Sequence, residues 1–227
     1  MAKLLLLESS TTNCSVGLAE DGKLIDLLEK NEGYTHSEHM ASFVQEILER
    51  NNVAPSELEA VAVGKGPGSY TGLRIGVSLA KGIAYGQNIP LISLESLQVI
   101  AKAAMDAGEK FDQIVPMIDA RRMEVYTCGY DSELKRLNPI EAKILDEQSF
   151  ETELKTSRIV FCGDGSHKFK ASCKSKNAIF LDDVYPSTKY MSQLAYEKFR
   201  NAEFEDSAYF EPYYLKEFIA LKPKKLI

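Results

Sequence analysis

Polar turns that follow apolar runs hold most of the residues that could do chemistry. Glu8-Ser9-Ser10-Thr11 comes directly after the apolar residues 3–7, and Asp119-Ala120-Arg121-Arg122 comes after the apolar residues 114–118. A short apolar run is typical of a buried strand, and a polar turn at its end can present carboxylates and hydroxyls to a ligand. Gly163-Asp164-Gly165 is a third turn of this kind. The alternative is that each is the ordinary polar loop that any α/β protein has after a buried strand.

The densest glycine run suggests an anion site. In Gly64-Lys65-Gly66-Pro67-Gly68 an expected strand passes into a helix that Thr71 is placed to cap, and the free N–H groups of a helix N-terminus attract anions. A Walker-type phosphate loop would need Lys and then Ser or Thr after its last glycine, but Leu73 follows Gly72. The run is therefore interpreted either as a nucleotide-binding loop or as a segment whose glycines permit a sharp turn and close helix packing.

The histidines do not form a recognisable metal or hydrolase site. His36 and His39 lie three residues apart with Glu38 between them, and no third ligand is near them in the sequence. We interpret the pair as the solvated start of a helix. His167 is isolated, and no Ser/His/Asp set can be assembled. We therefore expect no metal ligand and no hydrolase triad.

Two halves of the chain show the same order of elements. In the first half, strand patterns occur at residues 3–7, 14–19, 23–28, 60–63 and 91–94, and helix patterns at 37–50, 71–85 and 95–107. In the second half, strand patterns occur at residues 114–118, 124–130, 140–145, 158–162 and 178–181, and helix patterns at 148–155 and 187–200. The sequence predicts an α/β protein with two lobes of mixed β-sheet and flanking helices, residues 1–108 and 109–227. This is the duplicated layout of actin-like ATPases (the ASKHA class, RNase H-like).

In an actin-like layout the polar turns would meet in a cleft between the lobes. The first two turns occupy the positions of phosphate loops, and the third that of an adenosine-contacting turn. The candidate nucleotide site consists of Glu8, Ser10, Thr11, Asp119, Gly163, Asp164 and Gly165. A kinase of this class normally uses an aspartate to hold hydrated magnesium, and the longer Glu8 argues against independent ATP hydrolysis. We expect no cofactor of the protein's own, with ATP or ADP bound only in an assembled complex.

The helix expected at residues 71–85 has more apolar surface than one sheet requires. Its polar residues Arg74, Ser78, Lys81 and Tyr85 share one narrow stripe, and the rest is apolar or glycine. A single sheet face needs an apolar arc of only about 100°. Either the preceding helix covers the excess, or this helix also forms an interface with another protein.

The composition excludes several classes of protein. With 27 Lys and Arg against 33 Asp and Glu, the 227-residue chain has a net charge of −6, which argues against a free-standing nucleic-acid-binding protein. The apolar residues 4–7 are too few for a signal sequence or membrane span, so we expect a cytoplasmic protein without a membrane partner. The cysteines lack CxxC spacing, so we expect reduced thiols. Near the C-terminus we interpret the basic residues as a solvated tail rather than an RNA site; they include Lys222, Lys224 and Lys225.

Several segments together resemble the TsaB (YeaZ) family, which takes part in the bacterial synthesis of threonylcarbamoyladenosine (t6A) on tRNA. The most specific is residues 66–76, followed by Ala80-Lys81-Gly82. Residues 118–126, the turn at Gly163 and Pro212-Tyr213-Tyr214-Leu215 also resemble the family. The resemblance covers essentially the whole chain. It departs from the family at Glu8, where many relatives have Asp, and at Lys216, where Arg is common.

The resemblance implies a subunit without catalytic groups that binds and activates the related catalytic subunit TsaD, with the ATPase TsaE joining the assembly. TsaD modifies adenosine 37 of tRNAs that read codons beginning with adenine. This chain would therefore contact tRNA only as part of the complex. Counted from Pro90, the histidines of the His-x-x-x-His metal motif of TsaD would fall at Ser96 and Ile100, and isoleucine cannot ligate a metal. The alternatives are a stand-alone ATPase or small-molecule kinase and, less favoured, an M22-type metallopeptidase.

The resemblance also implies that the first two helices form the surface that binds TsaD, and that this surface forms a homodimer when TsaD is absent. The expected interface residues are His36, Met40, Phe43, Val44, Ile47, Leu73, Gly76, Val77, Ala80 and Ala84.

Overall fold

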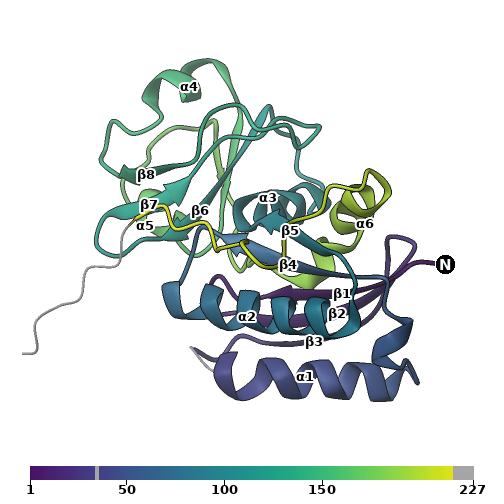
Figure 1. Cartoon of the computed structure of the whole chain (residues 1–227). Coiled ribbons are helices and arrows are strands. Elements are labelled where there is room, and N and C mark those ends of the chain that lie inside the picture. The colour runs from purple at the N-terminus through teal and green to yellow at the C-terminus, as the bar shows by residue number, and fades with distance from the viewer. Residues whose placement is uncertain (34–35, 217–227) are drawn as a thin grey trace, which may run out of the picture.

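The computed structural model describes residues 1–33 and 36–216, so the tail residues Lys222, Lys224 and Lys225 lie outside the described residues. Two five-stranded sheets form two lobes, one above the other in Figure 1. The first sheet has the order β3-β2-β1-β4-β5. Its strands are β1 (Lys3–Glu8), β2 (Cys14–Glu20), β3 (Lys23–Lys30), β4 (Ala60–Gly66) and β5 (Leu91–Glu95). Because β1 is antiparallel to β2 and parallel to β4, the sheet is mixed.

Helices cover both faces of the first sheet, which explains the unbroken apolar run of β1. The helices α1 (His36–Arg50) and α2 (Tyr70–Gln87) pack on the face that carries Leu5 and Leu7. The helices α3 (Ser96–Asp106) and α6 (Ser192–Arg200) pack on the face that carries Leu4 and Leu6. All four leucines are completely buried, as expected for a central strand of a covered sheet.

The second sheet repeats the strand order of the first, as β10-β9-β6-β7-β8. Its strands are β6 (Gln113–Asp119), β7 (Glu124–Thr127), β8 (Glu141–Ile144), β9 (Ile159–Cys162) and β10 (Ala178–Phe180), and its helices are α4 (Glu151–Thr156) and α5 (Ser166–Lys170). The pairing is again mixed, since β6 is antiparallel to β7 and parallel to β9. The predicted fold class of two mixed-sheet lobes with flanking helices is confirmed.

The lobes are joined by the helix α3, which packs in both, and by the described part of the segment after α6, which starts on the first lobe. Val99 of α3 packs in the core of the first lobe, while Ile100 of the same helix packs against the second sheet. After α6, the Glu205 N–H donates to the Leu91 carbonyl at 2.8 Å, so the chain at this point lies beside β5 of the first lobe. The expected boundary at residue 108 therefore separates the strands of the two sheets. It does not account for the segment after α6, which contacts the first lobe although it comes after residue 108.

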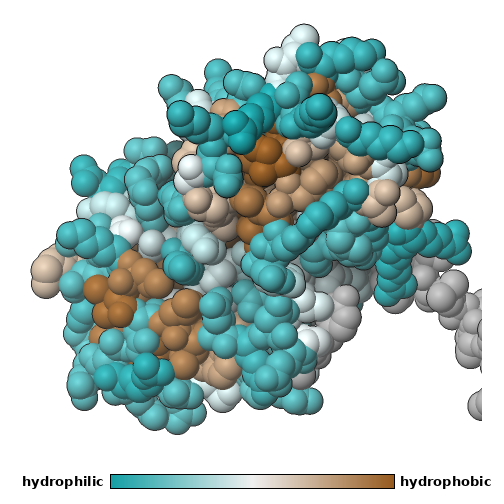
Figure 2. Space-filling view, turned by 180° about the vertical axis from the view of Figure 1, so that it is seen from behind, coloured by the Kyte–Doolittle hydropathy of each residue, from teal (hydrophilic) through white to brown (hydrophobic). Residues whose placement is uncertain are grey.

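Local details differ from the sequence expectations where an element is interrupted. The strand expected at residues 124–130 ends at Thr127, and the helix expected at residues 187–200 is divided into a 3-10 turn, η2 (Thr188–Tyr190), and α6. Seen from behind, the surface is mainly hydrophilic, with apolar side chains gathered in patches on both lobes (Figure 2). Within the described ranges, no helix is both long and apolar enough to cross a membrane.

Candidate ligand cavity and docking helices

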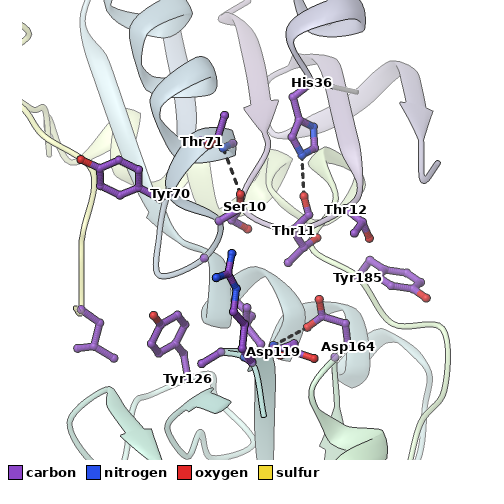
Figure 3. A pocket seen from close by; sticks show the side chains of 18 of the residues that line it. Ser10, Thr11, Thr12, His36, Tyr70, Thr71, Asp119, Tyr126, Asp164 and Tyr185 are labelled. Carbon is purple, nitrogen blue, oxygen red and sulfur yellow. Dashed lines mark hydrogen bonds between the residues drawn. The ribbon is translucent and has the colours of Figure 1, made fainter. Parts of the chain in front are cut away.

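A cavity of about 1140 Å³ lies between the two lobes. The first lobe contributes Ser10 and Thr11 from the turn after β1, and the second lobe contributes Asp119, Gly163 and Asp164. Figure 3 shows side chains of the two lobes facing each other across this space. The fold thus brings together five of the seven residues of the candidate nucleotide site.

Glu8 does not line the cavity, contrary to its place in the candidate site. Its side chain is completely buried, and its Oε1 accepts the Ser10 N–H at 2.7 Å. A Cβ at Gly64 would lie 2.1 Å from Glu8 Oε2, so the carboxyl occupies the space that glycine leaves open. Burial raises the pKa of Glu8. Gly165 is also buried and does not line the cavity.

The glycine-dense segment packs directly on the turn after β1. The Ser69 N–H donates to the Ser10 carbonyl at 2.6 Å, and a Cβ at Gly72 would lie 2.1 Å from the Ser9 carbonyl oxygen. The N-cap of α2 is Ser69, whose hydroxyl accepts the Gly72 N–H at 3.3 Å, and the expectation that Thr71 caps the helix is wrong. Close packing of two backbone segments therefore accounts for these glycines.

Two acidic groups at the second-lobe wall, Asp119 and Asp164, already have partners within the lobe. Asp119 pairs with Lys168 at 2.6 Å and also accepts the Arg121 N–H at 2.5 Å. Asp164 accepts the Asp119 N–H at 2.9 Å, and burial raises the pKa of its carboxyl. Since the first-lobe turn presents hydroxyls while Glu8 is buried beneath it, the two turns do not fit a hydrated magnesium ion held between them. The binding of ATP or ADP stays a prediction.

His36 is buried, and its expected place at a solvated helix end is wrong. The ring Nε2 donates to the Thr11 carbonyl at 2.7 Å, and this contact joins α1 to the cavity wall (Figure 3). Burial lowers the pKa of His36, which favours the neutral ring. His39 is partly exposed and stacks on Phe43 at 5.5 Å between ring centroids. Among residues 1–33 and 36–216, no group of three or more His, Cys, Asp or Glu side chains could hold a metal ion.

Most residues expected at the partner interface are buried inside the subunit. Only Phe43 is partly exposed; the buried ones are His36, Met40, Val44, Ile47, Leu73, Gly76, Val77, Ala80 and Ala84. Apart from His36, Leu73 and Gly76, they form the core beneath α1 and α2. These nine residues already pack within their own subunit, so they offer little surface to a partner in this structure, and their place in an interface stays a prediction.

The exposed flank of the same helices carries a different apolar set. Ile75, Leu79 and Ile83, spaced by four residues along α2, are partly exposed. A Cβ built on Gly82 or Gly86 would have no atom within 4 Å. We call Phe43, Ile75, Leu79, Gly82, Ile83 and Gly86 the docking face. It lies where α1 and α2 run side by side (Figure 1).

The polar stripe of α2 holds the C-terminal segment, residues 205–216. Lys81 Nζ donates to the Phe210 carbonyl at 2.9 Å, and Arg74 Nε donates to the Tyr214 hydroxyl at 3.3 Å. The Tyr213 N–H donates to the Lys65 carbonyl at 2.7 Å. Figure 1 shows this segment crossing from the first lobe to the second. The spacing of the stripe was visible in the sequence, but not the segment that covers it.

Comparisons with known proteins agree with this architecture. The family model described as "TsaD: tRNA N6-adenosine threonylcarbamoyltransferase" matches residues 32–225. The tRNA threonylcarbamoyladenosine biosynthesis protein TsaB of Haemophilus influenzae is 30% identical over 228 residues, which cover 96% of this chain and 95% of the relative. The chain belongs to the TsaB family.

Other relatives of this TsaB-family chain support the same assignment. TsaB of Escherichia coli is 28% identical over 97% of both chains, and TsaB of Bacillus subtilis is 39% identical over 55% of this chain and 54% of the relative. The solved structure of YeaZ from Pseudomonas aeruginosa has a TM-score of 0.78 and 24% identity, covering 95% of this chain and 100% of that structure. The YeaZ structure shows that the fold is shared.

The two positions that the resemblance sets against the metal motif of TsaD are core positions of this TsaB-family chain. Ser96 and Ile100 lie in the first part of α3 and are completely buried. Ile100 packs in the core of the second lobe.

Proposed function

We propose that this TsaB-family chain is an accessory subunit for t6A formation, which binds a TsaD-type catalytic subunit through the docking face and contributes no catalytic group. In this role the chain activates its partner, TsaE joins the assembly, and tRNA is met within the complex. Membership of the TsaB family supports a role in t6A formation. The observation that carries the binding mode is the apolar, glycine-containing flank of α2.

The docking face has the features of a helix interface. Ile75, Leu79 and Ile83 offer apolar surface on consecutive turns, and Phe43 of α1 adds an aromatic side chain beside the core. Gly82 and Gly86 lie one turn apart with open space above them, so a partner helix could approach the backbone closely. The same face would serve a second copy of the chain when the partner is absent.

Gly82→Leu tests the docking face without disturbing the subunit. The new side chain meets no atom within 4 Å of its Cβ, and leucine favours a helix more than glycine does. The variant should therefore fold and be at least as stable as the wild type. It should lose association with TsaD in titration calorimetry and lose t6A formation in an assay with purified subunits, because its side chain holds the partner helix away.

The matched control is Gln193→Leu, which adds leucine at an exposed position of α6 on the other face of the sheet. It should bind and support modification like the wild type. If Gly82→Leu binds TsaD and supports full modification, the docking face is assigned to the wrong surface. If the wild-type chain is not needed for modification when each subunit is omitted in turn, the accessory role itself is wrong.

A further inference from the structure

The outer strand of the second sheet ends in an exposed apolar side chain. Among the residues that the structure describes, β8 pairs with β7 and with no other strand, so it is an edge of the sheet. Its last residue, Ile144, is 72% exposed, and Met123 is 45% exposed. The Leu145 N–H donates to the Met123 carbonyl at 2.7 Å, which places these two apolar residues side by side. Native proteins usually cover or interrupt an edge of this kind, because its free backbone groups and apolar side chains favour association.

The described part of the chain ends next to this edge. Lys216, the last described residue, pairs with Glu124 of β7. Glu124 lies opposite Ile144 in the register of β7 and β8, and opposite residues of an antiparallel pair have their side chains on the same face of the sheet. Figure 1 shows the C-terminal segment ending near β7. The chain after Lys216 therefore starts from the face of the sheet that Ile144 occupies.

The residues that come next in the sequence are apolar. Residues 218–221 read Phe-Ile-Ala-Leu, and Pro223 follows after one lysine. Neighbouring strands lie about 4.8 Å apart and an extended residue spans about 3.3 Å, so two residues are enough to carry the chain from β7 to β8. Contact of the apolar run with Ile144 and Met123 would remove apolar surface of both partners from water.

The charges on the two sides are of opposite sign. Asp146 and Glu147 directly follow β8 and are exposed, and neither forms an ion pair within the described ranges 1–33 and 36–216. Residues 217–227 contain three lysines and one glutamate. Attraction between these groups would favour the approach of this segment to β8.

We propose that residues 218–221 of this chain pack over Ile144 and Met123 and cover the outer edge of the second sheet. The segment before them is held on α2 through Lys81, and Tyr213 and Lys216 line the cavity between the lobes. Anchoring at β8 thus makes the end of the chain a strap from the first lobe to the far edge of the second. This cover does not depend on the proposed function, because both of its parts belong to one chain.

A tryptophan reporter tests the cover, because the chain contains no tryptophan. Phe218→Trp is made in the full chain, and its emission is excited at a wavelength where tyrosine does not absorb. If residue 218 packs over Ile144, the emission maximum should lie at a shorter wavelength than in the urea-unfolded chain, and quenching by acrylamide should be severalfold weaker. Leu221→Trp is a second reporter for the other end of the apolar run, and it should show the same shift.

Ile144→Thr, added to each reporter, should move the emission and the quenching toward the values of the unfolded chain. Threonine keeps the β-branched shape that suits a strand while it removes apolar surface. Met123→Ser should act in the same direction. The matched control is Ile25→Thr, since Ile25 is 51% exposed on β3, the edge strand of the first sheet. It should leave both measurements unchanged, and circular dichroism shows that each variant is folded.

The proposal is overturned if both reporters emit and are quenched as in the unfolded chain, and the edge would then be left to a partner protein. It is also overturned if the shift disappears on dilution, since the cover would then come from a second copy. An equal response to Ile25→Thr, or no response to Ile144→Thr and Met123→Ser, would show that the apolar run packs elsewhere and would contradict the proposal.

Discussion

The two lobes share a strand order but differ in what covers their strands. In the first lobe the connections between strands contain α1 with 15 residues and α2 with 18, and α3 with 11 residues leads from β5 to the second lobe. In the second lobe the connections before and after β9 contain only α4 with 6 residues and α5 with 5. The same topology thus supports long helices with an exposed flank in one lobe and short turns in the other. This difference explains why the docking face lies on the first lobe.

The turns that follow the first strand of each lobe show the same contrast. At the end of β1, Glu8 is buried beneath the glycine segment that leads into α2. At the end of β6, Asp119 is 37% exposed and pairs with Lys168 of α5, a helix of only 5 residues, and the turn that follows presents Arg121 and Arg122 to solvent. Equivalent positions in a repeated fold therefore become either core or surface according to the length of the helices that cover them.

The largest effect is expected for Gly64→Ala in the first lobe. Its Cβ would lie 2.1 Å from Glu8 Oε2, and relief of this overlap should cost about 3 kcal/mol of unfolding free energy. The cost should fall sharply in a Glu8→Ala background, because the clashing atoms are gone. Urea unfolding of the four proteins in this double-mutant cycle measures it. An equal cost in both backgrounds would contradict the close contact.

Gly163→Ala is the counterpart in the second lobe. Its Cβ would lie 2.3 Å from the backbone oxygen of Met117, and Gly163 has φ 91°. No side-chain truncation can relieve this contact, so Gly163→Ala should be as costly in the Glu8→Ala background as alone.

A smaller effect is expected for the change in the free energy of unfolding with pH that the Glu8 carboxyl causes. Its pKa is raised by burial, so the folded chain keeps a proton that the unfolded chain loses near the ordinary value of 4.5. Above that pH the folded state binds more protons, and the free energy of unfolding therefore falls as pH rises until the folded carboxyl ionises as well. The slope from this one group is at most about 1.4 kcal/mol per pH unit.

Glu8→Gln cannot ionise, so it should remove this fall in stability. Urea unfolding at a series of pH values between about 4 and 8 measures the difference from the wild type. Asp164→Asn is the matched variant in the second lobe, where burial also raises the pKa of the carboxyl. It should leave the contribution of Glu8 in place. Parallel curves for the wild type and Glu8→Gln would show that the carboxyl titrates alike in both states.

The smallest effect is expected for Asp119→Asn. Lys168 would lose its ion pair but would keep its hydrogen bond to the Glu124 carbonyl at 2.9 Å. Because Asp119 is partly exposed, the cost should be about 1 kcal/mol in urea unfolding. The control Asp182→Asn breaks the exposed pair with Lys170 and should cost less than about 0.5 kcal/mol. An equal cost for both variants would mean that the burial of Lys168 does not matter.

Much of the fold could be predicted from the sequence because strand and helix patterns are local. The unbroken apolar run of β1 and the polar turn after it mark a buried strand, and the order of elements was enough to predict a duplicated α/β fold. The sequence was less informative about segments whose position depends on contacts with distant parts of the chain. The segment after α6 has no strong periodicity, and its position follows from its contacts with Lys81 and Lys65.

The candidate sites were only partly predictable. Ser10 and Asp119 meet at the cavity as expected, because Ser10 follows β1 and Asp119 ends β6, the first strand of each sheet along the chain. Glu8, at the end of β1, has the same polar character but is turned into the core. Val77 and Ala80 show a similar limit of the sequence on α2. The apolar arc indicates that this face of the helix is covered, but it does not indicate which neighbouring element covers it.

The sequence by itself determined the order of strands and helices, the two polar turns and the family motifs, because these depend on the types and spacing of residues close in the chain. Only the tertiary structure decided which of those residues are accessible. It buried Glu8 beneath Gly64, laid the C-terminal segment on the polar stripe of α2, and left Arg121 and Arg122 without an ion pair among the residues it describes. Burial and charge pairing depend on segments distant in sequence, and no local pattern records them.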